Sequence, residues 1–486
     1  MPFAPQAPLS GVAWKPADVL WYRRRFDAPS APRLLLHLGA VDYRATVWVN
    51  GEEVARHEGG HTPFSADLTG RVRDRDNELV VRAEDPLADL SIPRGKQYWK
   101  PEPEGIFYTP TSGIWQTVWL EPLPERPLEI VDLRADPTGL DFDIRGEGEL
   151  QLTVGAAGWK GPAGRGRLGL TVQPWSPDQP NLYGLSVRLG DDRVETYFGL
   201  RSGEPVVQRL VLDQGYFPGG WLTAPTDSAF RRDIRLAKAM GFNGARKHQK
   251  VEDPRWLYWA DRMGFLVWGE MANAHAATPE AEARTRAEWA EAVRRDRHHP
   301  CIAAWVPMNE SFGLRDTTDG ERARVVDGLY RLTKELDPTR PALSNDGWEH
   351  ATSDLLTLHD YDPPETLAAR YRSLDGVLAA GGRPHPPYLP GYRHRGEPVI
   401  VSEFGGLVVD DAEAWGYGSV RDAAELAATY RAEVEALMDP GPVEGFCYTQ
   451  LTDVEQERNG LLTFDRRPKA DPSLIREATL TPKRHT

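Results

Sequence analysis

The chain has 486 residues, which is too long for one ordinary hydrophobic core and predicts about two to four domains. Its formal net charge of −14 argues against a nucleic-acid partner, because phosphate binding requires local positive charge. Its two cysteines cannot form a disulfide framework, and no apolar run approaches bilayer length. With no basic start followed by an apolar core, the N-terminus shows no signal peptide, so we expect a soluble cytoplasmic protein.

Residues 1–122 have an all-β pattern. Apolar runs at 34–38 and 45–49 alternate with turn residues, and Asn50-Gly51 is a strong hairpin signal because both positions tolerate positive φ. Short strands without a helical period predict a β-sandwich or a jelly roll. A long aromatic loop over 87–111 interrupts the pattern. Loops of that length in compact domains are usually functional or disordered, and the aromatic content favours a functional loop.

Residues 123–202 are rich in glycine and carry two strand candidates, at 149–154 and 182–189. This pattern predicts a small second β-sandwich. The segment is short for a complete sandwich.

Residues 203–486 alternate between apolar strand-like runs and helical segments. A helix is expected to begin at Asp253-Pro254 and to end before Gly264, since proline is favoured in the first turn. Eight strands in about 280 residues predict a (β/α)₈ barrel. The rival is a doubly wound open sheet, but no Gly-rich phosphate loop follows the first run. The eight apolar runs are 207–212, 242–245, 265–268, 302–306, 342–344, 355–358, 399–401 and 445–448.

Two of these runs lead into a glutamate, Glu310 after the fourth and Glu403 after the seventh. A buried strand has no packing reason to finish on an unpaired charge. Strands four and seven face one another across an eight-stranded barrel, and the chemistry of such barrels lies at the carboxyl ends of the strands. We therefore expect both carboxylates in one pocket. The alternative is that they are ion-paired strand ends, for instance with Arg246.

Paired carboxylates suit the cleavage of glycosidic bonds, in which one group is the acid and the other the nucleophile or base. Retaining enzymes hold the two carboxyl groups roughly 5 Å apart. Glu310 is the predicted acid, with a pKa raised by burial and by its neighbour's charge. Glu403 is the predicted nucleophile, and Asn309 is expected to bind the sugar 2-hydroxyl. No His, Glu or Asp set has metal-ligand spacing, so we expect neither a metal nor a cofactor.

Three stretches carry a family resemblance: 43–51, 295–310 and 460–469. The second contains Trp305 and Asn309-Glu310. Together they resemble glycoside hydrolase family 2, which includes β-galactosidases, β-glucuronidases and β-mannosidases. The resemblance implies a jelly roll, an immunoglobulin-like sandwich and a barrel, with retention of anomeric configuration. It assigns the acid/base role to Glu310 and the nucleophile role to Glu403. Relatives are often dimers or tetramers, so a homo-oligomer stays open.

Further positions match substrate-site residues of the family. Tyr361 matches a tyrosine that hydrogen-bonds the nucleophile, and Arg246 matches an arginine that supports it. Tyr448 stands where relatives often carry a pocket-floor tryptophan, although a core aromatic is the alternative. Asp213 either binds sugar hydroxyls or caps its loop. A substrate histidine of the family falls near two adjacent residues of this chain, His248 and Gln249.

Departures from the family pattern bear on the sugar. β-Galactosidases commonly place a histidine three residues beyond the nucleophile, and this chain has Gly406 there. β-Glucuronidases carry an Asn-x-Lys element for the uronate carboxylate, which aligns with Glu457-Arg458-Asn459. Glu457 would repel a carboxylate, and Arg458 would partly compensate.

The preferred hypothesis is an exo-acting retaining β-glycosidase on a small neutral carbohydrate or glycoside, of the β-galactosidase type. One alternative is the same chemistry on β-mannosides, α-L-arabinopyranosides or β-glucuronides. Another is a catalytically silent carbohydrate-binding protein, which two opposed carboxylates disfavour.

Overall fold

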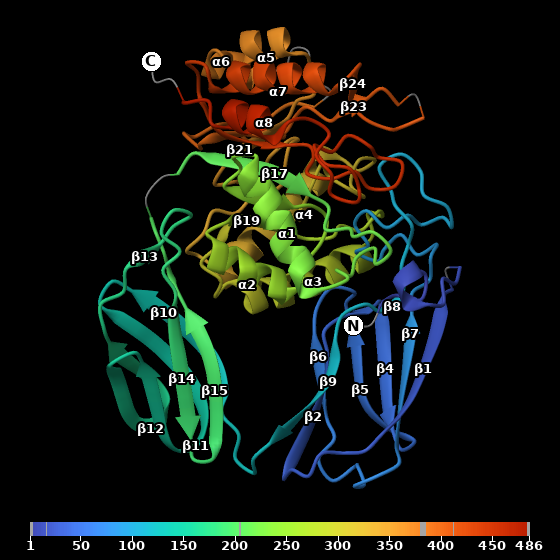
Figure 1. Ribbon diagram of the computed structural model, residues 1–486, viewed down its shortest axis with the longest axis vertical. Helices are drawn as coiled ribbons and strands as arrows, with labels where there is room; N and C mark the ends of the chain where they lie inside the picture. Colours follow the sequence, from blue (N-terminus) through green and yellow to red (C-terminus); the bar gives the residue numbers. More distant parts are fainter. Residues whose placement is uncertain (1–2, 16, 204–205, 380–384, 412, 484–486) are drawn as a thin grey trace.

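The structure is a computed structural model that describes residues 3–15, 17–203, 206–379, 385–411 and 413–483. Two β-rich units, N-terminal and middle, lie side by side beneath a larger α/β unit (Figure 1). The three units follow one another along the chain, and the exact domain boundaries expected from the sequence stay predictions. Among the described residues, no helix is long and apolar enough to cross a bilayer.

The described part of the N-terminal unit is a sandwich of two antiparallel sheets. Alternate residues of each inner face are buried, as on the strand 44–49, where Ala45, Val47 and Val49 point into the core. Asn50 and Gly51 have positive φ and form the expected tight turn. One sheet has the order β1 (Val19–Phe26), β7 (Asn77–Glu84), β4 (Arg44–Val49), β5 (Glu52–Glu58), and the other β6 (Phe64–Asp67), β2 (Arg33–Leu38), β9 (Val118–Leu123). The short elements are η1 (Pro8–Ser10), β3 (Val41–Asp42) and β8 (Gly113–Ile114).

The middle unit is one curled antiparallel sheet with a short parallel pair beside it. Its central strand β11 changes register between Ile144 and Glu149, so its first half pairs with β10 and its second half with β14. The curl wraps the sheet around a small apolar core. Both predicted strands are present, and the immunoglobulin-like topology stays a prediction. The strands are β10 (Glu129–Asp136), β11 (Gly139–Val154), β12 (Ala157–Gly169), β13 (Pro174–Trp175), β14 (Tyr183–Leu189), β15 (Asp192–Phe198) and β16 (Leu200–Arg201).

The third unit is the barrel, in which seven parallel strands pair in one sheet within the described ranges. The expected strand 342–344 meets its neighbour only through a bridge from Trp305 to Ala342, with Leu343 N donating to Trp305 O at 3.0 Å. It lies where the fifth strand belongs, between β20 and β21. The order is β20 (Ile302–Val306), β19 (Leu266–Glu270), β18 (Gly244–Lys247), β17 (Gln208–Asp213), β25 (Val443–Tyr448), β22 (Val399–Glu403), β21 (Leu356–His359).

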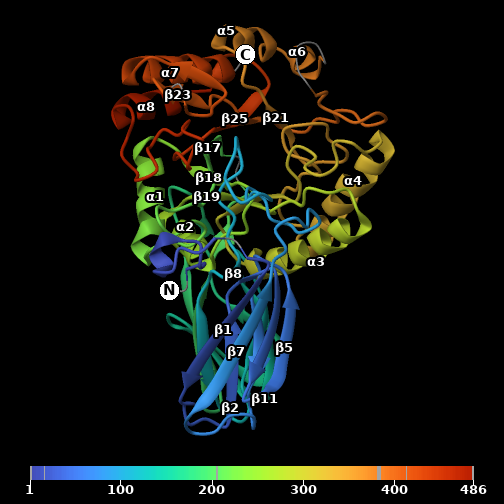
Figure 2. The ribbon, with the colours of Figure 1, turned by 90° about the vertical axis from the view of Figure 1, so that its right-hand side faces the viewer.

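Helices surround this sheet (Figure 2), and their ends follow local sequence signals. Asp253 caps α2 by accepting from Arg255 N, and Gly264 ends it in the left-handed conformation. Thr318 and Glu321 form a reciprocal capping box at α4. The elements are α1 (Asp227–Ala239), α2 (Pro254–Met263), α3 (Pro279–Asp296), α4 (Asp319–Leu336), α5 (Pro364–Arg370), α6 (Leu374–Leu378), α7 (Ala423–Met438) and α8 (Pro472–Thr479), with β23 (Leu407–Val409) and β24 (Gly418–Val420) as a short pair.

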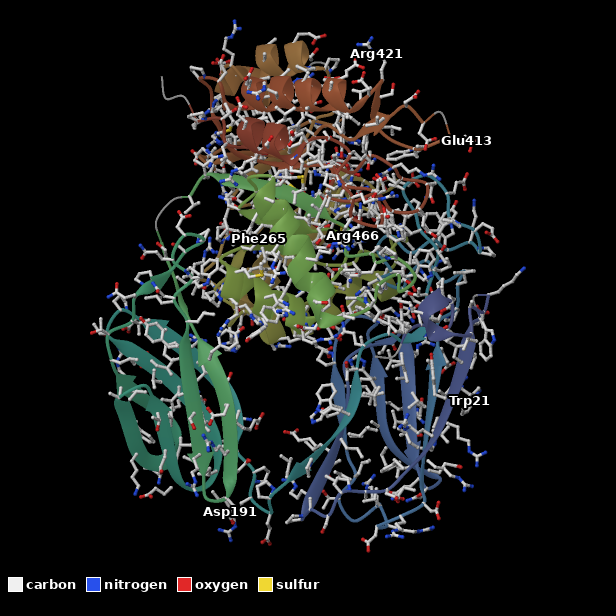
Figure 3. All side chains as sticks on the ribbon, in the orientation of Figure 1. Trp21, Asp191, Phe265, Glu413, Arg421 and Arg466 are labelled. Atoms are coloured by element: carbon white, nitrogen blue, oxygen red, sulfur yellow. The ribbon has the colours of Figure 1, made fainter. Side chains whose placement is uncertain are left out.

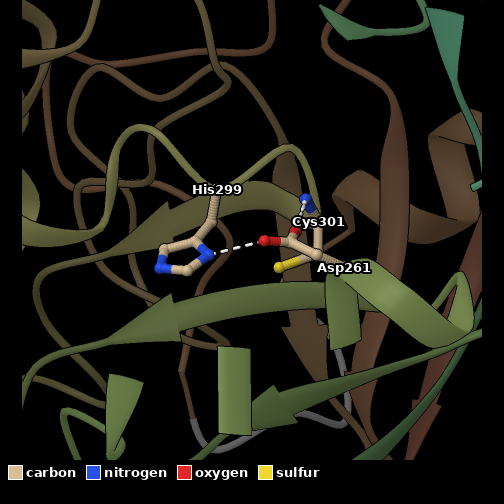
Figure 4. Close-up of side chains that lie close together, drawn as sticks. All are labelled: Asp261, His299 and Cys301. Atoms are coloured by element: carbon tan, nitrogen blue, oxygen red, sulfur yellow. Dashed lines mark hydrogen bonds and ion pairs between the residues drawn. The ribbon is translucent and has the colours of Figure 1, made fainter. Parts of the chain in front are cut away.

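A polar cluster of Asp261, His299 and Cys301 joins the middle unit to the barrel (Figure 4). Asp261 Oδ2 accepts from the Tyr197 hydroxyl at 2.8 Å and lies 2.6 Å from His299 Nδ1. Asp261 Oδ1 accepts from Cys301 N at 2.8 Å. Both carboxylate oxygens are therefore engaged within the protein, and burial raises the pKa of the Cys301 thiol. These contacts indicate a structural role for the cluster between the two units, and Cys301 is buried within it.

Trp305 tests how far the barrel core depends on one side chain. It is fully buried, and its indole N–H donates to Asp337 at 2.9 Å. Trp305→Ala should lower the free energy of unfolding by about 3–5 kcal/mol, because it opens a cavity and removes one of the hydrogen bonds to Asp337. Trp21→Ala is the control, since Trp21 is 63% exposed on the outer N-terminal strand (Figure 3) and should lose about 1 kcal/mol. Equal shifts of the urea midpoint would contradict this account.

Candidate active site

The carboxylates of Glu310 and Glu403 lie together at the carboxyl ends of the barrel strands. Glu403 is the last residue of β22, and Glu310 follows β20 by a short turn. One oxygen of each glutamate and one ring nitrogen of His359 all lie within 4.8 Å of one another. Glu310 has a φ of 48°, a left-handed conformation that is strained for a residue with a Cβ. A backbone bond of 3.0 Å from Glu310 N to Asp346 O holds it there.

Arg246, on β18, is completely buried at the centre of the site. Its guanidinium lies 2.6 Å from Glu270, 2.6 Å from Asp346 and 2.8 Å from Glu403 Oε1. It also donates to Asn309 Oδ1 at 2.7 Å. The ion pair that the sequence left open as an alternative therefore exists for Glu403. It coexists with the pocket arrangement and holds one oxygen of that carboxylate in place.

Tyr361 holds the other oxygen of Glu403. Its hydroxyl donates to Oε2 at 2.5 Å and lies 3.1 Å from Thr449 Oγ1. Its ring stacks on Tyr417, with 3.4 Å between the ring centroids. With both oxygens bonded, Glu403 has a single fixed orientation, as an attacking group requires.

His359, the last residue of β21, connects three carboxylates. Its Nδ1 lies 2.7 Å from Glu310 Oε1, and its Nε2 lies 3.1 Å from Asp346 Oδ2 and 3.3 Å from Glu403 Oε1. Burial alone would lower the pKa of His359, but the surrounding carboxylates raise it to about 10.

The protonation of Glu310 differs from the sequence-based expectation. Burial raises its pKa, but the hydrogen bond and charge of His359, with Lys96 and Arg315, bring the pKa below its usual value. The expected raised pKa is therefore wrong for this arrangement, because the sequence did not reveal a cation beside the carboxylate. Because the pKa of His359 is raised and that of Glu310 is lowered, the free site favours the proton on His359.

The remaining predicted residues divide into two groups. His248 and Gln249 adjoin the centre: His248 Nδ1 lies 3.0 Å from Arg246, and Gln249 N donates to Glu270 at 2.9 Å. Asp213 instead pairs with Lys247 at 2.7 Å and accepts from Gly215 N at 2.8 Å, which is the loop-capping alternative.

Tyr448, offered as a sugar platform, has no exposed surface. Its ring packs edge-on against Phe404 and Tyr430. It is a core aromatic, the alternative that the sequence left open.

Two models of one protein family match the chain. The family model "Glycosyl hydrolase 2 galactose-binding domain-like" matches residues 2–104, and "Glycosyl hydrolases family 2, TIM barrel domain" matches residues 224–406. The chain belongs to glycoside hydrolase family 2.

Among relatives of this family 2 hydrolase, a β-glucuronidase from Paenibacillus borealis is 26% identical over 94% of this chain and 87% of its own length. A β-galactosidase from Thermoanaerobacter pseudethanolicus is 26% identical over 66% of this chain and 48% of its own. The solved β-glucuronidase of an uncultured Clostridium species shares the fold, with a TM-score of 0.79 at 20% identity over 98% of this chain and 91% of its own.

Sequence reasoning missed three residues of the hydrolase site: Glu270, Asp346 and His359. Glu270 ends an apolar run at the third strand, so the signal that marked Glu310 and Glu403 would have found it. His359 directly follows a strand-like run beside Tyr361. Asp346 had no such signal, because the fifth strand is irregular.

The raised pKa of His359 predicts how the stability of the fold changes with pH. A histidine protonated mainly in the folded state stabilises the hydrolase fully below its unfolded pKa of about 6.5. That contribution is lost as the pH rises through the folded pKa of about 10. Over this window the urea midpoint of the wild type should therefore fall more steeply than that of His359→Asn. Parallel curves would show that His359 is not charged in the folded protein.

Proposed function

We propose that this glycoside hydrolase is a retaining, exo-acting β-glycosidase with Glu403 as nucleophile and Glu310 as acid/base. The supporting observation is that carboxylate oxygens of the two residues lie within 4.8 Å of each other. Such proximity suits direct attack on the anomeric carbon and leaves too little room for the water that an inverting enzyme places between its carboxylates.

In the first step Glu403 attacks the anomeric carbon while Glu310 protonates the departing oxygen, which gives a glycosyl-enzyme. In the second step Glu310 takes a proton from water, and the water displaces Glu403 with a second inversion. Asn309 has its Oδ1 directed at Arg246, so its NH₂ group remains as the donor for the sugar 2-hydroxyl.

The acid step needs a proton on Glu310, and His359 supplies it. The 2.7 Å contact between His359 Nδ1 and Glu310 Oε1 allows the proton to pass directly. The two groups therefore hold one transferable proton as a pair, and their titration belongs to the pair.

Fewer observations bear on the identity of the sugar than on the mechanism. The neutral-sugar hypothesis of the β-galactosidase type depends on Glu457, whose charge opposes a carboxylate. The family relatives are mainly β-glucuronidases, which favours the uronide alternative. Arg458, expected to compensate in part, pairs with Asp411 at 2.6 Å, which weighs against that role. The fit of the two carboxylates argues against a silent binding protein, and a homo-oligomeric state stays a prediction.

Glu403→Gln tests the nucleophile. Because the substitution turns the nucleophilic carboxylate into a neutral amide, kcat on an aryl β-glycoside should fall on the order of 10³-fold or more. Glu413→Gln is the control, since Glu413 is exposed at the periphery (Figure 3) and should keep full activity. Proton NMR of the first wild-type product should show the β-anomer. Undiminished activity of Glu403→Gln, or an α-anomer as first product, would refute the mechanism.

His359→Asn tests the proton pair. In the wild type, the alkaline limb of kcat/KM reports loss of the proton shared by His359 and Glu310, whose pKa is raised toward 10. In the variant Glu310 alone carries the proton, and a carboxyl group releases it at lower pH. The alkaline limb should move down by more than about one pH unit. An unchanged limb would show that His359 takes no part in the acid step.

A further inference from the structure

Lys96 is a buried cation without a fixed partner. It is only 5% exposed, and no carboxylate lies within ion-pair distance of its ammonium among the residues that the structure describes. The neighbouring buried lysines differ: Lys247 pairs with Asp213 at 2.7 Å, and Lys250 pairs with Glu252 at 2.9 Å. Burying an unpaired ammonium costs several kcal/mol, so an unpaired one at a substrate site indicates an anion that arrives from outside.

The position of Lys96 is fixed by contacts between units. It belongs to the connection between β7 and β8, the light-blue segment that climbs from the N-terminal sandwich onto the barrel (Figures 1 and 2). Gly95 N donates to Asn273 O at 3.1 Å, and His275 Nε2 lies 2.8 Å from Gly95 O. A Cβ at Gly95 would lie 2.2 Å from Gln249 O, so only glycine allows this approach. The loop is therefore locked onto the strand ends that also support Asn309.

The charge of Lys96 acts on titratable groups on several sides of the barrel mouth. It lowers the pKa values of Glu310, Glu457, His248 and His275. Its ammonium therefore lies within electrostatic range of these side chains, the proposed acid Glu310 among them.

Glu457 does not serve as the partner of Lys96. Its Oε2 accepts from the Tyr108 hydroxyl at 2.5 Å, and its Oε1 accepts from Asn459 at 3.2 Å. Burial raises the pKa of Glu457, which favours its uncharged form and weakens its repulsion of an anion.

We propose that Lys96, supplied by the N-terminal sandwich, is the specificity-determining residue that receives the carboxylate of a β-linked uronide. This inference rests on the proposed glycosidase function and names its substrate class. Lys96 replaces the cation of the Asn-x-Lys element, which this chain lacks. The neutral-sugar hypothesis counted Glu457 as the decisive charge, whereas Lys96 provides the ammonium that a sugar carboxylate requires.

The experiment compares kcat/KM for 4-nitrophenyl β-D-glucuronide and β-D-galacturonide with kcat/KM for the β-D-galactoside and β-D-glucoside. The full-length wild type should prefer a uronide by at least about 10-fold. Lys96→Met should lose about 100-fold on uronides and less than about 3-fold on neutral glycosides, because it removes only the charged contact. Lys96→Arg should retain part of the uronide activity.

Lys100→Met is the matched control, since Lys100 lies in the same loop with a side chain 59% exposed. It should leave every rate unchanged. Thermal unfolding of each variant separates loss of the carboxylate contact from loss of fold. If the Lys96 variants do not fold, the wild-type preference decides alone.

A wild type that prefers neutral glycosides overturns the inference, and so does an equal loss on both substrate classes in Lys96→Met. If the wild type cleaves no glycoside, the proposed function fails separately, and calorimetry with D-glucuronate and D-glucose then tests Lys96. Binding of glucuronate that Lys96→Met abolishes would support the site, whereas equal binding of both sugars, or of neither, would overturn it.

Discussion

The arrangement of the site depends on one buried guanidinium. Arg246 is inaccessible to water and bonds acids from three separate parts of the barrel, Glu270, Asp346 and Glu403. Several carboxylates packed this closely would repel one another, and a buried ion cluster is tolerable only when its charges are matched and bonded. The guanidinium has five N–H donors in a rigid plane, so it can satisfy several acceptors at once where a lysine would act as a point charge. It thereby fixes the orientations of both the Glu403 carboxylate and the Asn309 amide.

Three cations near the two catalytic glutamates, Arg246, His359 and Lys96, differ in the partners that they have. Arg246 is saturated by protein acceptors, and His359 is shared between Glu310, Asp346 and Glu403. Of these three, Lys96 is the one without a carboxylate partner among the residues that the structure describes. Arg246 and His359, which have partners within the protein, belong to the barrel, whereas Lys96 belongs to the sandwich. The bond-breaking chemistry and the choice of substrate are therefore divided between two units. A mixed core cluster that includes Tyr108, Trp115 and Tyr216 packs sandwich against barrel and keeps that division rigid.

The sequence predicted the features that depend on local pattern. Apolar runs located the barrel strands, and the glutamates that follow two of these runs located Glu310 and Glu403. This was possible because the carboxyl ends of the strands of a closed barrel converge on one site, independently of the loop conformations. It could not predict the charge on His359, which arises from residues far apart in the chain. Nor could it predict Lys96, whose surroundings lie more than 150 positions away. The irregular fifth strand concealed Asp346, and the neutral-sugar hypothesis followed from reading Glu457 without its partners Tyr108 and Asn459.

The position of Lys96 also links recognition to proton delivery. In the free site its charge helps to depress the pKa of Glu310, which keeps the proton on His359. A sugar carboxylate bound to Lys96 would neutralise that charge and add a negative one nearby, and both changes raise the pKa of Glu310. The proton would then move along the 2.7 Å contact from His359 to Glu310 when a uronide occupies the site. A neutral sugar supplies no such change, so discrimination would appear in the acid step as well as in binding.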